Sequence, residues 1–91
     1  MDFSIGQVVI SKAGRDKGDV FIVFDVLGEY LHLVDGRARP IANPKKKKTK
    51  HVQPTHTIST TLQQAITGRQ YIKDSDFRNA LNIFKGNRED N

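Results

Sequence analysis

The feature that most restricts the fold is an eight-residue apolar run, Val20–Leu27 (VFIVFDVL), which contains a single charge at Asp25. β-branched and aromatic residues are favoured in strands, and β-branched residues lose side-chain freedom in helices. We therefore expect a central, strongly curved strand here rather than a helix. Shorter strand candidates lie on either side: residues 8–10 are apolar, and Tyr30–Val34 alternates as a half-buried strand does.

Turn signals separate these candidates. Residues 13–19 are a polar stretch with glycines at Gly14 and Gly18. Asp35 and Gly36 both tolerate positive φ, which predicts a two-residue hairpin. A fourth strand over residues 37–41 is therefore expected to fold back on the third. Pro40 indicates that it is an edge strand or leaves the ladder at that point, because proline has no N–H to donate. Residues 51–53 are the candidate for a last strand.

The second half of the chain is typical of helices. Residues 59–61 (STT) can cap a short helix that ends at Gly68. A second helix is expected from Asp74 or Ser75 to Gly86. Its apolar residues have the i, i+3, i+4, i+7 spacing of an amphipathic stripe: Phe77, Ala80, Leu81 and Phe84.

These elements predict a mainly β fold with C-terminal α structure: a small closed or near-closed barrel of five short strands, on which two short helices pack. The expected division of the chain is a barrel over residues 1–56, a helical appendage over residues 57–86 and a disordered tail over residues 87–91.

The charge of the chain is concentrated in one block. Fifteen Lys and Arg against ten Asp and Glu give a net charge of +5. Residues 1–36 carry six acidic and three basic residues, whereas residues 37–51 carry seven basic residues and no acidic one. Such a block favours an anionic partner, most commonly nucleic acid, with a solvated loop or a targeting segment as alternatives.

The polar stretch at residues 13–19 is a second candidate contact. Its cations can reach phosphates while its glycines let the backbone turn tightly; the alternative is a plain loop whose glycines only supply positive φ. The predicted RNA contacts are Lys12, Arg15, Lys17, Arg37, Arg39, Lys45, Lys46, Lys47, Lys48, Lys50 and His51, and the predicted structural turn residues are Gly14, Gly18, Asp35 and Gly36.

Residues 6–18 (GQVVISKAGRDKG), followed by the apolar run, resemble a KOW motif: a short hydrophobic strand, a polar loop, a required glycine at Gly18 and a second hydrophobic strand. The resemblance continues through residues 33–36 (LVDG), the lysine run and residues 50–55 (KHVQPT). Over about residues 5–55, the chain resembles the large-subunit ribosomal proteins of archaea and eukaryotes that begin with a KOW domain, and the short standalone KOW-domain RNA-binding proteins of bacteria.

This resemblance implies an SH3-like barrel that docks on structured RNA without catalysis. We therefore expect a cytoplasmic RNA-binding protein, associated with the ribosome through rRNA. One alternative is a transcription-elongation-type KOW module. Another is an SH3-like protein-interaction domain that contacts a partner through Phe77, Leu81 and Phe84.

The sequence lacks the residue patterns of zinc sites, nucleophilic enzymes and nucleotide-binding loops. The histidines, at positions 32, 51 and 56, match no zinc spacing, and the chain has no cysteine, which also suits a reducing compartment. No nucleophile-elbow sequence and no phosphate-binding loop is present. We expect no enzyme activity, cofactor, metal or membrane span, and a monomer when free.

Tyr30 and His32 suit either stacking on an unpaired base or half-burial at the barrel rim.

Overall fold

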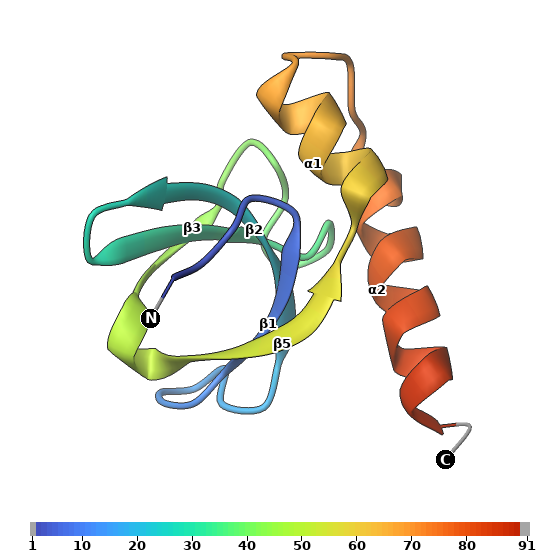
Figure 1. Ribbon diagram of the computed structural model, residues 1–91. Helices are drawn as coiled ribbons and strands as arrows, with labels where there is room; N and C mark the ends of the chain where they lie inside the picture. The colour runs from blue at the N-terminus through green and yellow to red at the C-terminus, as the bar shows by residue number, and fades with distance from the viewer. Residues whose placement is uncertain (1, 90–91) are drawn as a thin grey trace.

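The apolar run forms the central strand of an antiparallel sheet in the computed structural model, which describes residues 2–89 (Figure 1). The sheet has five strands in the order β4-β3-β2-β1-β5, and it curls into a barrel-like shape. The elements are β1 (Gln7–Ser11), β2 (Val20–Leu27), β3 (Tyr30–Val34), β4 (Lys45–Lys48), a 3-10 turn η1 (Thr49–His51), β5 (Val52–Ile58), α1 (Thr60–Thr67) and α2 (Asp74–Glu89).

The central strands are buried on both faces. On the inner face of the curl, Val9, Phe21 and Val23 pack with residues of β3 and β5. On the outer face, Val8 and Ile22 pack with residues of the helices. Because both faces of β2 are covered from Val20 to Val23, its sequence is a continuous apolar run rather than an alternation. The strand prediction for this run is confirmed.

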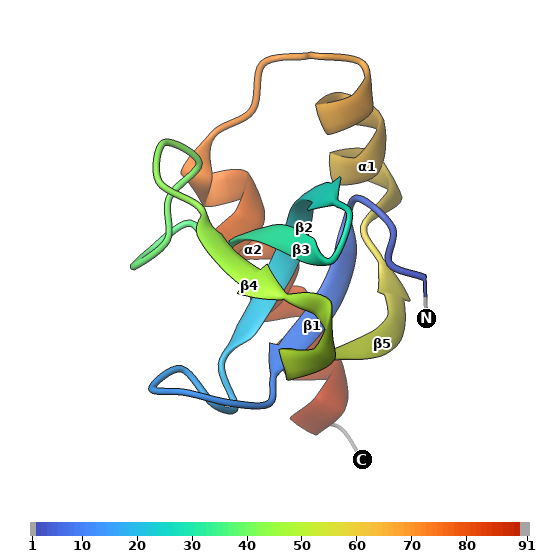
Figure 2. The same ribbon diagram turned by 90° about the vertical axis from the view of Figure 1, so that its left-hand side faces the viewer.

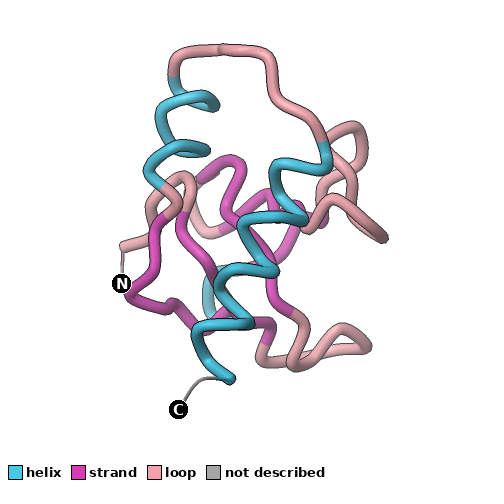
Figure 3. Tube along the Cα trace, turned by 90° about the vertical axis from the view of Figure 1, so that its right-hand side faces the viewer, coloured by secondary structure: helices cyan, strands magenta, loops and turns pink. Residues whose placement is uncertain are grey.

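The helices cover the outer face of the sheet. Figure 3 shows α2 lying across the strands, and its residues Phe77, Leu81 and Phe84 are at most 9% exposed. Their stripe completes the same core as Val8, Val20, Ile22 and Val34. The side chains that the sequence offered as a contact for a protein partner are therefore occupied inside the molecule.

The predicted fourth strand is wrong, and so is the two-residue hairpin before it, since Gly36 has a positive φ but Asp35 does not. Residues 37–41 form a loop, and the fourth strand is the lysine run Lys45–Lys48, which pairs with β3. The carboxylate of Asp35 accepts hydrogen bonds from the backbone N–H groups of Arg37 (2.8 Å) and Arg39 (2.9 Å). Such local side-chain bonding offers the backbone an alternative to a hairpin ladder, so the chain leaves the sheet at Asp35 and returns ten residues later.

Two element boundaries also differ from the sequence prediction. β5 runs on past Pro54 to Ile58, and a proline is tolerated there because β5 is an edge strand that pairs only with β1. α2 continues through Gly86 to Glu89, because Gly86 keeps an ordinary helical backbone instead of the left-handed conformation that ends a helix. The predicted tail is thus helical to residue 89, and residues 90–91 lie outside the described residues.

The start and end of α1 agree with the prediction. The Ser59 hydroxyl accepts a hydrogen bond from the Leu62 N–H (3.3 Å), and the helix ends at Gly68. Over residues 2–89, no helix combines the length and the apolar character needed to cross a membrane.

Candidate nucleic-acid interface

The four lysines of β4 alternate between the two faces of the sheet. In the register with β3, Lys45 and Lys47 lie opposite Leu33 and Leu31, whose side chains are buried on the inner face. Lys46 and Lys48 lie opposite His32 and Tyr30, which are half-buried on the outer face. Because side chains alternate along a strand, the inner and outer lysines meet different surroundings.

The inner lysines hold β4 to the loop between β1 and β2. Lys47 Nζ lies 2.7 Å from Asp16 Oδ1 and 2.7 Å from the carbonyl oxygen of Ala13, and its side chain is only 10% exposed. Lys45 Nζ lies 3.9 Å from the other carboxylate oxygen of Asp16. The Ser11 hydroxyl also donates to Asp16 (2.7 Å). These contacts make Lys47 a structural residue rather than a free cation.

Asp16 is the electrostatic centre of this contact. Burial by itself would raise the pKa of the carboxyl group. The hydrogen bonds from Lys47 and Ser11, together with the charges of Lys47 and Lys45, outweigh burial and hold the pKa of Asp16 below its usual value. The carboxylate is therefore ionised at neutral pH, and it offsets one of the two positive charges on the inner side of the lysine strand.

The outer lysines converge on one aromatic ring. Lys46 Nζ lies 4.6 Å and Lys48 Nζ 5.8 Å from the centroid of the Tyr30 ring. Both lysine side chains are exposed, and within the described residues neither makes an ion pair with a carboxylate. We call Tyr30, His32, Lys46 and Lys48 the lysine–tyrosine face. Figure 2 shows the strands that carry it, β3 and β4, toward the viewer, with α2 behind them, so this part of the outer face is not the part that the helix covers.

Two further predicted cations lie beyond the end of β4. Lys12 and Lys50 are exposed and line a shallow recess together with Phe3, Thr49 and Pro54. The backbone N–H of Lys12 donates to the carbonyl oxygen of His51 (2.8 Å), which ties the end of β1 to η1. His51 itself is half-buried.

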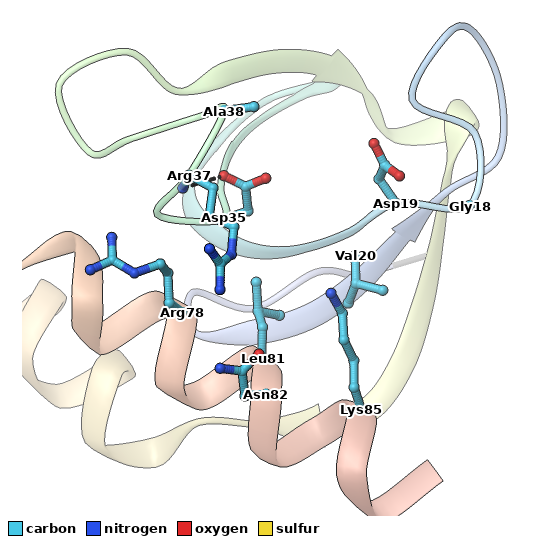
Figure 4. Close-up of a pocket in the computed structure, with 10 residues that line it drawn as sticks. All are labelled: Gly18, Asp19, Val20, Asp35, Arg37, Ala38, Arg78, Leu81, Asn82 and Lys85. Carbon is cyan, nitrogen blue, oxygen red and sulfur yellow. Dashed lines mark hydrogen bonds between the residues drawn. The ribbon is translucent and has the colours of Figure 1, made fainter. Parts of the chain in front are cut away.

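Arg37 lies apart from the lysines, in a cavity of about 290 Å³ between α2 and two loops of the sheet (Figure 4). Arg78 and Lys85 of α2 also line this cavity, as do two carboxylates, Asp19 and Asp35. Arg78 Nη1 donates to the carbonyl oxygen of Gly36 (2.7 Å) and so holds the loop to the helix. The sequence prediction missed both helical cations, although their seven-residue spacing places them on one helix face.

The remaining predicted contacts lie around the loop between β1 and β2. Arg15, Arg39 and Lys45 line a recess that they share with three acidic residues: Asp16, Asp19 and Asp35. Lys17 is exposed at the loop itself. The basic block of the sequence is thus divided among several surfaces. Acidic side chains line two of the recesses, whereas none lines the recess of Lys12 and Lys50. Beside the lysine–tyrosine face, Asp25 of β2 is the register partner of His32, although it forms no ion pair with Lys46 or Lys48.

The predicted turn glycines have the backbone that was expected of them. Gly14, Gly18 and Gly36 have φ values of +85°, +92° and +77°. The N–H of Gly18 donates to the carbonyl oxygen of Ser11 (2.9 Å), which closes the loop. Positive φ accounts for these glycines whether or not the loop contacts RNA.

Within residues 2–89, the His, Asp and Glu side chains form no group of three or more that could hold a metal ion. No protein-family model matches this chain, and no curated protein matches it.

Proposed function

We propose that this chain is a non-enzymatic RNA-binding protein of the KOW type, which docks on structured rRNA of the ribosomal large subunit in the cytoplasm. The curved five-stranded antiparallel sheet, in which β5 returns to pair with β1, supports the SH3-like barrel that the motif at residues 6–18 implies. The lysine–tyrosine face is the proposed centre of the RNA contact.

The main support is the electrostatic contrast between the two sides of β4. Asp16 compensates the inner lysines, whereas the outer lysines, Lys46 and Lys48, have no carboxylate partner among the described residues. Lysines are point charges that follow phosphates without reading bases. Lys12 and Lys50 extend this uncompensated surface around the end of the strand.

RNA is favoured over DNA because the cations lie on a sheet edge and a turn. A protein that reads double-stranded DNA usually inserts a basic helix into the major groove. The first turn of α2 carries Asp74 and Asp76, and its apolar face is buried against the sheet. The helix is therefore unsuited to a groove, whereas a rigid sheet with exposed lysines suits the irregular surface of folded RNA.

A pair of double variants tests the proposal. Lys46→Gln/Lys48→Gln should weaken binding to purified large-subunit rRNA by roughly 10- to 30-fold at about 0.1 M salt, because two phosphate contacts are lost. Its thermal unfolding should stay close to that of the wild type. Lys45→Gln/Lys47→Gln is the matched control with the same change of charge, and it should lower the unfolding temperature while leaving the affinity of the folded protein within a few-fold. Equal losses of affinity in the two variants would refute the assignment of the outer face.

Sedimentation tests the ribosomal part of the proposal. The tagged protein should migrate with ribosomal particles at low salt and leave them as the salt concentration rises. A protein that stays at the top of the gradient at every salt concentration is not associated with the ribosome.

A further inference from the structure

Tyr30 is half-buried at the surface and belongs to neither core cluster. It is the first residue of β3, and its register partners are Leu27 on β2 and Lys48 on β4. Leu27 is 44% exposed, so the ring lies beside apolar surface that water can reach. Within the described residues the Tyr30 hydroxyl makes no hydrogen bond, and no buried side-chain polar atom lacks a partner, so this hydroxyl faces solvent.

The Tyr30 ring lies close to two positive charges, those of Lys46 and Lys48. Two ammonium groups within 6 Å of one ring attract its π-electrons but repel each other. An anion between or beside them would relieve this repulsion. A ligand that offers both a flat π-surface and flanking negative charges therefore satisfies the ring and the lysines together.

A nucleotide has this combination, and an unpaired one can use it. Base stacking on an aromatic side chain contributes when the base can leave its own stack, as in RNA loops, bulges and single strands. A base inside a duplex is covered on both faces by its neighbours and cannot lie on a protein ring. Lysine side chains are long and flexible, so Lys46 can move from the ring to a phosphate when a base takes its place.

We infer that Tyr30 is a stacking site for an unpaired RNA base, with Lys46 and Lys48 binding the phosphates on either side. This inference rests on the proposed RNA-binding function and specifies which part of an RNA the lysine–tyrosine face contacts. On this inference, the Tyr30 ring contributes to RNA affinity by stacking, in addition to the electrostatic attraction of the lysines.

The fluorescence of Tyr30 provides a direct test. The chain has two tyrosines and no tryptophan, so in a Tyr71→Phe background the emission comes from Tyr30. Tyr71 is 88% exposed and lies on the loop before α2, so this change leaves the lysine–tyrosine face intact. Single-stranded oligouridine at low salt should quench the emission as it binds. A fully paired RNA of the same length should leave the emission nearly unchanged.

Variants of Tyr30 separate stacking from charge. Tyr30→Leu should weaken oligouridine binding by roughly 5- to 100-fold, the range for loss of one stacked base. The salt dependence should stay as in the wild type, since no cation is removed. Tyr30→Phe keeps the ring and should bind within a few-fold of the wild type. Thermal unfolding of each variant confirms that the folded protein is being compared.

The two hypotheses fail in different ways. Salt-dependent oligouridine binding with unchanged Tyr30 emission would overturn the stacking site and leave the RNA-binding function standing. If the wild-type protein binds neither oligouridine nor large-subunit rRNA, the proposed function fails, and the stacking site fails with it. The emission measurement uses an intact Tyr30, so the inference stays testable even if Tyr30→Leu does not fold.

Discussion

Single residues decide which charges of this protein are available. The first 36 residues are net acidic, which is unexpected for a surface that lies against phosphates. Asp16 is one of these acidic residues: it binds Lys45 and Lys47 and so joins the β1–β2 loop to the fourth strand. One carboxylate thus removes two of the seven cations of the basic block from the candidate RNA surface.

Asp16→Asn should lower the free energy of unfolding by about 1–3 kcal/mol at neutral pH, because a partly buried charged hydrogen-bond network loses its anion. The folded-state pKa of Asp16 is lowered, so its contribution is complete above the unfolded value of about 3.9 and is lost as the pH falls through the folded value. Urea unfolding at about pH 7, 5 and 3 should therefore show the same difference between wild type and variant at pH 7 and 5 and a smaller difference at pH 3. A constant difference would contradict this role.

Gly36 is a second residue on which the fold depends. Its φ is +77°, and an added Cβ would meet the carbonyl oxygen of Asp74 and, at 3.0 Å, Cγ of Arg78. Gly36→Ala should therefore displace α2 and lose more stability than Gly28→Ala, its control, which has a φ of +62° and no atom within 4 Å of the added Cβ. The control should cost about 1–2 kcal/mol for the left-handed backbone alone. Chemical denaturation of both variants measures the difference; equal losses would mean that the contact with α2 is easily relaxed.

The helices and strands that could be predicted from the sequence were those with a recognisable pattern of apolar residues. β2 was predictable because both of its faces are buried, and α2 because its stripe faces the sheet. β4 carries no apolar residue, so it has no alternation for a strand prediction to detect. Lys47 can lie on the inner face of the sheet because its ammonium group pairs with Asp16. Pairing with a residue 31 positions away is invisible to a local pattern.

The candidate site was predictable in composition but not in arrangement. The sequence identified the basic block, and an alternating strand over Lys45–Lys48 would have divided it into two faces. Because the strand over Lys45–Lys48 was not predicted, the sequence analysis treated all seven cations as one RNA-binding surface. Arg78 and Lys85 were missed because they join Arg37 only through the packing of α2 on the sheet.

The packing of α2 gives a prediction for an element. Phe77 is fully buried between α2 and the sheet, so Phe77→Ala should cost about 3–5 kcal/mol, much of the stability of a domain of this size. Ile83 lies on the same helix but is 66% exposed, and Ile83→Ala should change stability by no more than about 0.5 kcal/mol. Thermal unfolding followed by circular dichroism compares the two. Similar effects would mean that α2 does not share the core of the sheet.

For the whole molecule, the number of cations that contact RNA phosphates can be obtained from the salt dependence of the binding affinity. If Lys12, Lys46, Lys48 and Lys50 make the phosphate contacts, the affinity for single-stranded RNA should fall about 50-fold between about 50 and 200 mM salt. If all seven cations of the block took part, the loss would be several hundred-fold. Anisotropy titrations with labelled oligouridine measure the slope, and a slope near zero would remove electrostatic docking altogether.

The position of the lysine strand also has a consequence for how copies of this protein behave toward each other. β4 and β5 are the two edges of the sheet, and exposed edges tend to pair with other strands and start aggregation. A row of four lysines protects one edge by repulsion, and Pro54, which lacks an N–H donor, interrupts the other. Lys46 and Lys48, which are proposed to hold RNA, should therefore also help to keep copies of the chain apart at high concentration. Variants that neutralise them should be checked for self-association before any loss of binding is interpreted.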